Sequence, residues 1–165
     1  MVPETSTKRL TIAFTGHRPG KLAGKHNEII GAIQALLFKL KPDYAIVGMA
    51  EGADMLAAAI CRMLKLPYEA AVPFEGQSAY YKAESLEAYI KLLEDADKVT
   101  LVSEGVYKPW YFQKRNEYMV DNCDLLIAIW DGSPGGTANC VKYAKKVGRK
   151  ILYLNWETWE FEERE

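Results

Sequence analysis

Three short glycine-rich segments carry most of the side chains that could do chemistry in this sequence. They are residues 15–19 (TGHRP), 48–54 (GMAEGAD) and 131–137 (DGSPGGT). Backbone amides beside glycine, a forked guanidinium and carboxylates are groups that bind phosphates and sugar hydroxyls. We therefore expect the three segments to form one pocket for a phosphate-bearing, nucleotide-like ligand.

The first segment follows an apolar stretch and offers Gly16, His17 and Arg18. Gly16 would let the backbone approach a ligand closely, and Arg18 would present paired donors to phosphate. A tight turn with solvated side chains explains the same residues, so both interpretations stand for this segment alone.

The second segment places Gly48, Glu51, Gly52 and Asp54 at a predicted strand-to-helix junction. Glu51 or Asp54 could bind ribose hydroxyls. Asp54 could equally serve only as a helix cap, since acidic side chains satisfy helix amides. No such structural role accounts for Glu51.

The third segment is the strongest candidate, because it follows a buried strand and opens a helix. Its bare amides and hydroxyl would lie at the positive helix end, which favours anions. It is neither a P-loop nor a GxGxxG turn, because the required spacings are absent. The candidate ligand-binding residues are Asp131, Gly132, Ser133, Gly135, Gly136 and Thr137.

Arg115 lies upstream at the start of a predicted helix and could clamp phosphate or carboxylate from the same sheet end. Two aromatic clusters, residues 80–81 and 110–112, could stack a base or act as a lid. Aromatic loops also form core edges and subunit interfaces, and we favour that structural interpretation here.

Strand-like and helix-like patterns alternate along the chain, which is typical of a parallel sheet covered by helices on both faces. The predicted strands are residues 9–14, 44–47, 69–72, 98–102, 125–130 and 150–154. Residues 125–130 are apolar without alternation and should form a central strand. We expect a single three-layer, Rossmann-like α/β domain over residues 1–165, with a doubly wound, mainly parallel sheet of five to six strands. Its core spans about 9–154, and residues 155–165 form an acidic tail.

The composition favours a cytoplasmic protein. A net charge of −1 gives no broad field for a nucleic acid, so such a partner is not expected. Cys61, Cys123 and Cys140 suggest neither disulfides nor a zinc site, and we expect no metal and no cofactor. The polar N-terminus and the lack of long apolar runs indicate no export signal and no membrane span.

Together the motifs resemble the SLOG superfamily, which joins DprA/SMF and "Lonely Guy" proteins on one Rossmann-like fold. The YpsA-like branch is the most similar, with a TGHRP-type turn, a GxxxGAD turn, an Arg115-Asn116 helix and a late glycine turn, over about residues 10–154. The resemblance implies a nucleotide site that includes Asn116, and a homodimer or higher homo-oligomer.

Lonely Guy enzymes cleave the N-glycosidic bond of nucleoside monophosphates with an arginine in RKxxM and a glutamate in PGGxGTxxE. Arg115 and Met119 fit the first motif, but Cys140 stands where the glutamate is expected. A neutral thiol cannot stabilise the developing sugar cation. Nucleoside deoxyribosyltransferases, which are similar around residues 124–144, face the same objection.

We therefore expect a sensor or binding protein for a nucleotide or its derivative, with NAD and ADP-ribose relatives among the candidates. The alternative is an N-glycosidase (phosphoribohydrolase) or nucleoside transferase in which Arg115 clamps phosphate while Glu51 or Asp131 stabilises the sugar cation. Single-stranded DNA binding ranks third, because the chain has the aromatic residues but not the basic groove.

Overall fold

A computed structural model describes residues 9–164 of the chain. Residues 1–8, on which the expected absence of an export signal depends, lie outside the described part. Within the described part, no helix has the length and apolar character needed to cross a membrane.

Helices and strands alternate as the sequence patterns predict. The strands are β1 (Thr11–Gly16), β2 (Tyr44–Val47), β3 (Tyr68–Val72), β4 (Lys98–Leu101), β5 (Leu125–Ile129), β6 (Lys150–Leu154) and β7 (Phe161–Glu162). The helices are α1 (Pro19–Leu22), α2 (His26–Leu40), α3 (Ala53–Met63), α4 (Ala83–Asp95), α5 (Tyr111–Asp121) and α6 (Gly136–Lys146). The strand order is β4-β3-β2-β1-β5-β6-β7, and only the β6–β7 pair is antiparallel.

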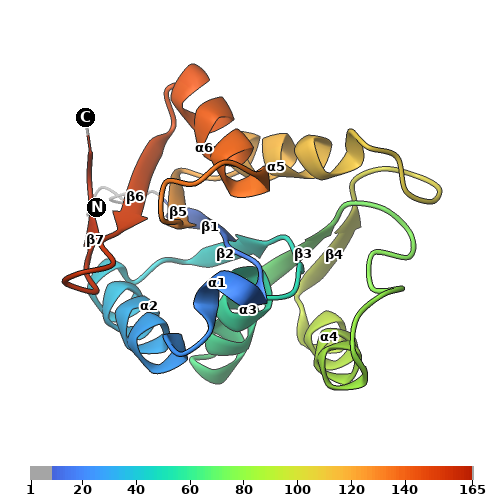
Figure 1. Ribbon diagram of the computed structural model, residues 1–165, viewed down its shortest axis with the longest axis horizontal. Coiled ribbons are helices and arrows are strands. Elements are labelled where there is room, and N and C mark those ends of the chain that lie inside the picture. Colours follow the sequence, from blue (N-terminus) through green and yellow to red (C-terminus); the bar gives the residue numbers. More distant parts are fainter. Residues whose placement is uncertain (1–8, 165) are drawn as a thin grey trace, which may run out of the picture.

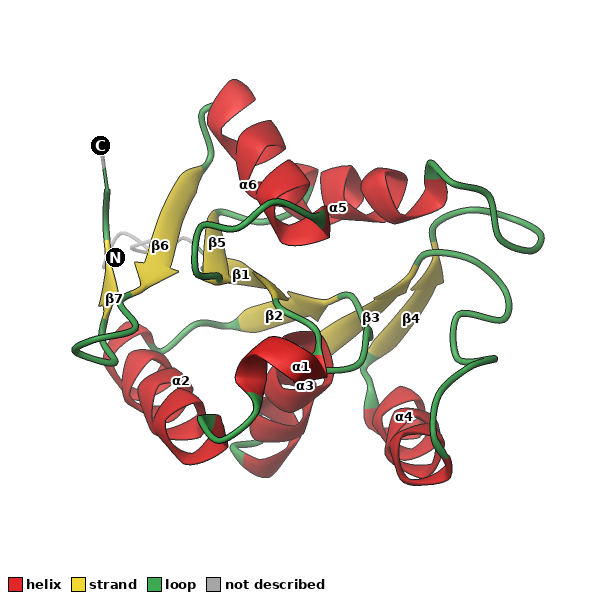
Figure 2. Cartoon of the chain, viewed as in Figure 1, coloured by secondary structure: helices red, strands yellow, loops and turns green. Residues whose placement is uncertain are grey.

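The sheet lies between two helical layers. Figures 1 and 2 show α5 and α6 on one face and α1 to α4 on the other. Successive strand residues point to opposite faces, so Ile12 and Phe14 pack with α2 and α3, whereas Ala13 packs with α5 and α6. All five residues of β5 are buried, as expected for a strand covered on both sides. The three-layer, doubly wound α/β fold is thus confirmed.

The sheet has seven strands, one more than the six that the sequence patterns predict. The extra strand, β7, has only two residues, too few for a periodic signal. It pairs with β6 through Leu154 and Phe161. Trp156 also packs against the core and donates its indole N–H to the carbonyl of Trp130 at 2.7 Å. The acidic segment after residue 154 is therefore partly folded onto the sheet, through an element that the sequence patterns did not predict.

The carboxyl ends of the parallel strands lead into the candidate turns. Strand β1 runs into TGHRP, β2 into GMAEGAD and β5 into DGSPGGT. The strand order changes direction at β1, which has β2 on one side and β5 on the other. Ligands in open α/β sheets bind outside the strand ends at such a switch point.

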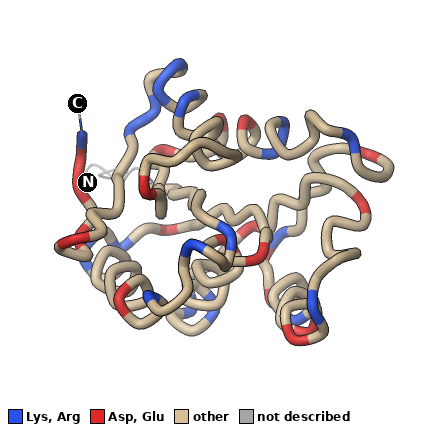
Figure 3. The backbone as a smooth tube through the Cα atoms, in the orientation of Figure 1, with Lys and Arg blue, Asp and Glu red and all other residues tan. Residues whose placement is uncertain are grey.

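Charged residues of both signs are interspersed along most of the backbone (Figure 3). A basic run, Lys145, Lys146, Arg149 and Lys150, lies where α6 ends and β6 begins. This is the amino edge of the sheet, so the run lies at the opposite end of the strands from the three turns.

Candidate functional site

The three turns are joined to each other by backbone contacts. The amide of His17 donates to the carbonyl of Ile129 at 3.1 Å, and the amide of Ala53 donates to the carbonyl of His17 at 3.0 Å. A Cβ atom on Gly16 would lie 2.5 Å from the Cβ of Ala53, and one on Gly52 would overlap the carbonyl oxygen of His17. Gly52 also has a φ of 97°, which favours glycine. These glycines therefore allow the turns to pack closely together.

Gly48 lies against two buried ionisable side chains. A Cβ atom at this position would lie 2.5 Å from Nη1 of Arg115 and 2.7 Å from Oδ2 of Asp54. Nη1 of Arg115 donates to the carbonyl of Gly48, and Nε2 of Gln77 donates to the same oxygen at 3.0 Å. The absence of a side chain at Gly48 thus makes room for the guanidinium.

A cavity of about 270 Å³ opens where β1, β2 and β5 end. The residues that line it and were predicted as site residues are Gly16, Arg18, Asp54, Arg115, Asn116, Gly136 and Thr137. Among residues 9–164, no side chain caps the start of α6, whose N-cap is Gly135. Gly136 and Thr137, which begin this helix, line the cavity, and a helix start without a capping side chain favours an anion.

Burial controls the ionisation of the groups in this cavity. Desolvation raises the pKa of the Asp54 carboxyl above its ordinary value, although nearby Arg115 and the amide of Ala50, at 3.2 Å, act the other way. Desolvation also lowers the pKa of Arg115, but a guanidinium stays protonated in proteins. The Asp54 side chain bonds to the turn before α3 and does not cap that helix.

Cys140, which stands where related enzymes carry a glutamate, is fully buried on α6. Desolvation raises the pKa of its thiol to about 11. The group is therefore neutral near pH 7, so the objection that Cys140 cannot act as a carboxylate holds in the folded structure.

Asp131 is held beside the cavity by a small polar cluster. Its carboxylate accepts from Lys21 at 3.0 Å and from the hydroxyl and amide of Ser133, which hold the pKa of Asp131 well below its usual range. Its amide donates to Nε2 of His17 at 2.9 Å. Burial lowers the pKa of His17, favouring the neutral ring that can accept this bond. Lys21 thus fixes the third turn to α1, and His17 fixes it to the first turn. The side chains of His17, Asp131 and Ser133 serve these contacts, and none of the three residues lines the 270 Å³ cavity.

A second cavity, of about 530 Å³, adjoins the first and shares Arg18 and Phe112 with it. We call it the aromatic cavity. It lies between the loop after β3 and the loop after β4, which are linked by the amide of Glu75 and the carbonyl of Gly105 at 3.1 Å. Glu51 lines this cavity, whereas its neighbour Ala50 lines the first.

The structure thus divides the predicted site residues into three groups. One group lines the first cavity, Glu51 lines the aromatic cavity, and the third holds the turns together. Gly48 also belongs to the third group, and Gly132 and Gly135 have positive φ angles of 94° and 142° in the loop before α6. Sequence reasoning did not include Phe112 among the ligand-binding residues or identify Lys21. The aromatic cluster at 110–112 was a signal for Phe112, whereas nothing in the pattern marked Lys21.

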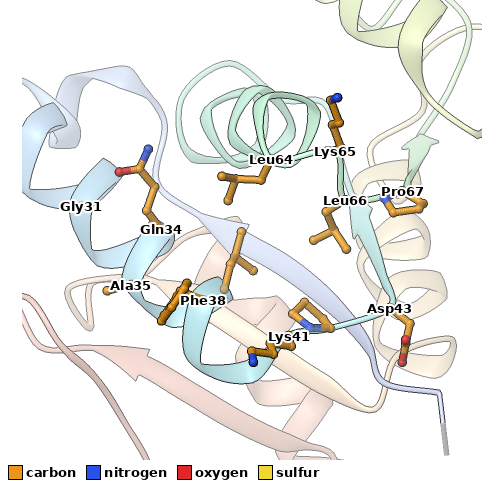
Figure 4. A pocket seen from close by; sticks show the side chains of 12 residues that line it. Gly31, Gln34, Ala35, Phe38, Lys41, Asp43, Leu64, Lys65, Leu66 and Pro67 are labelled. Carbon is orange, nitrogen blue, oxygen red and sulfur yellow. The ribbon is translucent and has the colours of Figure 1, made fainter.

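A larger groove of about 900 Å³ lies at the amino edge of the sheet, between the ends of α2 and α3 (Figure 4). Phe38, Leu64 and Leu66 line it, and it includes none of the predicted site residues. Size alone therefore does not mark the site. Within residues 9–164, no group of three His, Cys, Asp or Glu side chains is arranged to hold a metal ion.

Comparison by sequence identifies relatives over almost the whole described chain. The model of the YspA SLOG family matches residues 12–157. The SPbeta prophage-derived protein YoqJ of Bacillus subtilis (strain 168) is 32% identical over 149 residues, which are 81% of this chain and 84% of YoqJ.

Comparison by structure finds the same fold in more distant proteins. DNA processing protein A (DprA) from Streptococcus pneumoniae superposes with a TM-score of 0.69 at 19% identity over 90% of this chain, which spans about half (51%) of that protein. DprA from Helicobacter pylori, described with a single-stranded DNA binding mode, gives 0.64 at 18% identity, covering 88% of this chain and 65% of that one. The molybdenum cofactor carrier protein MCP from Chlamydomonas reinhardtii gives 0.59 at 12% identity, covering 88% and 76%. At these identities the likeness establishes the fold alone.

Proposed function

This chain belongs to the YspA SLOG family, and from that premise we propose that it binds a nucleotide or nucleotide-derived ligand as a sensor or binding protein. The phosphate would occupy the cavity at the carboxyl ends of β1, β2 and β5. Family membership and fold leave the ligand open, because one fold carries many functions. The proposal therefore depends on the chemistry of the cavity.

The observation that carries the proposal is the pairing of Arg115 with the start of α6 in one cavity. Arg115 is only 5% exposed, and its guanidinium is fixed by the carbonyl of Gly48 and by the Oδ1 of Asn116. Gly136 and Thr137, the first residues of α6, line the same cavity. A fixed guanidinium and helix amides together bind phosphate strongly, because the donors need little reorganisation.

The neutral form of Asp54 also suits an anion. An ionised carboxylate beside a phosphate would repel it, and burial disfavours that ionised form. The cavity volume of about 270 Å³ lies just below the range for small-molecule sites, roughly 300–1,000 Å³. We infer that it accepts the phosphate of a nucleotide, while the sugar and the base extend beyond it.

An N-glycosidase is the second candidate, and one observation favours it. A buried carboxyl with a raised pKa beside a phosphate site is a typical general acid. In this structure that group is Asp54, whereas Glu51 lines the aromatic cavity and Asp131 is bound to Lys21. If the protein cleaves nucleotides, we propose that the glycosidic bond, and not the phosphate, lies beside Asp54. Asp54 would then protonate the leaving base, and Asp54→Asn should abolish base release.

The test is to incubate the purified protein at near-stoichiometric concentration with nucleoside monophosphates, NAD and ADP-ribose. Retained and free molecules are then identified by mass spectrometry. Retention of an intact nucleotide supports the sensor, whereas free base beyond one equivalent supports the glycosidase. Retention of nothing contradicts both.

Gly136 offers a matched pair of variants for this assay. A Cβ atom at Gly136 meets no atom within 4 Å, so Ala fits without displacing a neighbour, and the Cβ of Asp is equally unobstructed. Gly136→Asp places a negative charge at the phosphate and should abolish retention, whereas Gly136→Ala should retain the ligand. Equal retention by both variants would exclude the start of α6 as the phosphate site.

A nucleic acid is not expected as a partner from the sequence, but the likeness to DprA does not support that expectation. A single-stranded oligonucleotide therefore belongs in the same assay. We propose that mononucleotides bind more tightly, because the cavity is bounded by buried groups. Tighter binding of the oligonucleotide would contradict this order. The homodimer expected from the family resemblance also stays a proposal, and light scattering of the same preparation measures it.

A further inference from the structure

The aromatic cavity is built from side chains that are only partly needed by the core. Phe74 is 6% exposed and is the buried member of this group of rings, whereas Tyr107 is 55% exposed. The rings of Tyr107 and Phe112 both meet Phe74 edge-on, at centroid distances of 5.5 and 5.3 Å. Two rings are thus held in fixed orientations at the wall of an open cavity.

This cavity adjoins the proposed phosphate site. Phe112 belongs to the walls of both cavities, and the guanidinium carbons of Arg18 and Arg115 lie 5.6 and 5.8 Å from its ring centroid. The boundary between the cavities runs between Ala50 and Glu51, which line different ones. A ligand with phosphate beside Arg115 can therefore continue past Phe112 without leaving the protein surface.

From this juxtaposition we infer that the aromatic cavity is the nucleobase subsite of the proposed nucleotide site. The inference rests on the proposed function and extends it to the class of ligand, a nucleotide whose base stacks on Tyr107 and Phe112. Fixed aromatic rings bind a planar base at low entropic cost, because Phe74 already restricts their motion. Stacking accepts any base, since every base has a π-face.

The polar groups at the boundary match the middle of such a ligand. The Glu51 carboxylate, which accepts hydrogen bonds, lines the same cavity as Arg18, which donates them. A ribose between the base and the phosphate presents hydroxyls that can donate to Glu51. This order places phosphate at Arg115, ribose near Glu51 and base at Tyr107.

The test compares ligands with and without a base. Dissociation constants of AMP, GMP, CMP, UMP and ribose 5-phosphate are measured by calorimetry on the wild type, Tyr107→Ala and Trp110→Ala. Trp110 is a matched control, because it is 57% exposed on the same loop but does not line the cavity. Circular dichroism confirms that each variant is folded.

We expect the tightest-binding nucleotide to bind the wild type more tightly than ribose 5-phosphate does. Tyr107→Ala should weaken the binding of that nucleotide about tenfold, because one stacking surface is lost. The dissociation constant of ribose 5-phosphate should not change. Trp110→Ala should behave as the wild type.

Two results would overturn the inference while the phosphate site stands. One is equal affinity of the wild type for ribose 5-phosphate and all four nucleotides. The other is that Tyr107→Ala changes the affinity for the nucleotides and for ribose 5-phosphate by the same factor, or changes neither. If the wild type binds neither these five compounds nor NAD or ADP-ribose, the proposed function and the base subsite fail together.

Discussion

Replacing Gly48 by alanine tests how tightly the proposed phosphate site is built. The added Cβ would lie 2.5 Å from Nη1 and 2.7 Å from Cζ of Arg115, and 2.7 Å from Oδ2 of Asp54. Ordinary van der Waals contact begins at 3.4 Å. The guanidinium must therefore move by most of an ångström, and its hydrogen bond to the Gly48 carbonyl is lost or distorted.

The cost follows from that one bond. A hydrogen bond to a charged group contributes about 1.5–3 kcal/mol to stability, so we expect the free energy of unfolding to fall by about 2 kcal/mol. For a chain of this length, each kcal/mol corresponds to about 2–4 °C, and the melting temperature should drop by about 4–8 °C. Nucleotide affinity should fall about tenfold or more, because the displaced guanidinium no longer points at the phosphate.

The assay is thermal unfolding with and without the nucleotide retained by the wild type. Gly136→Ala is the control, because it adds the same methyl group at the cavity beside Arg115, at a position where no atom lies within 4 Å. It should keep or slightly raise the melting temperature, since alanine favours a helix. If Gly48→Ala melts within 1 °C or so of the wild type and binds the nucleotide equally well, Arg115 is not fixed by Gly48 and the reasoning is wrong.

Three further predictions concern ionisable groups. A bound phosphate should raise the already elevated pKa of Asp54 further, so binding takes up a proton and affinity falls as pH rises through that pKa. Asp54→Asn should flatten the dependence of Kd on pH, and an unchanged slope would contradict this. Burial raises the pKa of Cys61 and Cys123 to about 12 and that of Cys140 to about 11. A thiol-specific disulfide reagent at pH 8 should therefore modify the three cysteines only after unfolding, and fast reaction of any thiol in the folded protein would count against the buried positions. The stability that the neutral thiols contribute should be present below about pH 9 and be lost as pH rises through the folded pKa values.

The sequence predicts the architecture well because the large elements have strong periodic signals. The continuous apolar run of β5 and the helical spacing in α2 are examples. Elements without periodicity escaped prediction. Helix α1 has four residues and β7 has two, and both are stabilised by tertiary contacts, such as the bond from Lys21 to Asp131.

The candidate site could be predicted only to the level of the turns. Their positions follow from the topology, since parallel strands end at one edge. Side-chain direction does not follow, because it depends on contacts between turns. Asp131 turns toward Lys21, whereas Asp54 turns into the cavity beside Arg115, and no pattern in the sequence separates these two carboxylates.

The close packing of Gly16, Gly48 and Gly52 also bears on how this fold diversifies. These glycines are required by backbone and side-chain packing among the turns, independently of which ligand is bound. The loops after β3 and β4, which form the aromatic cavity, carry no such restriction at Tyr80 or Tyr107, whose side chains are 98% and 55% exposed. Substitutions at exposed positions of these loops cost little stability, whereas a side chain at any of the three glycines would displace its neighbours. Shared glycine motifs in two sequences of this family therefore indicate a common scaffold, and differences in the two loops are the place to look for a change of ligand.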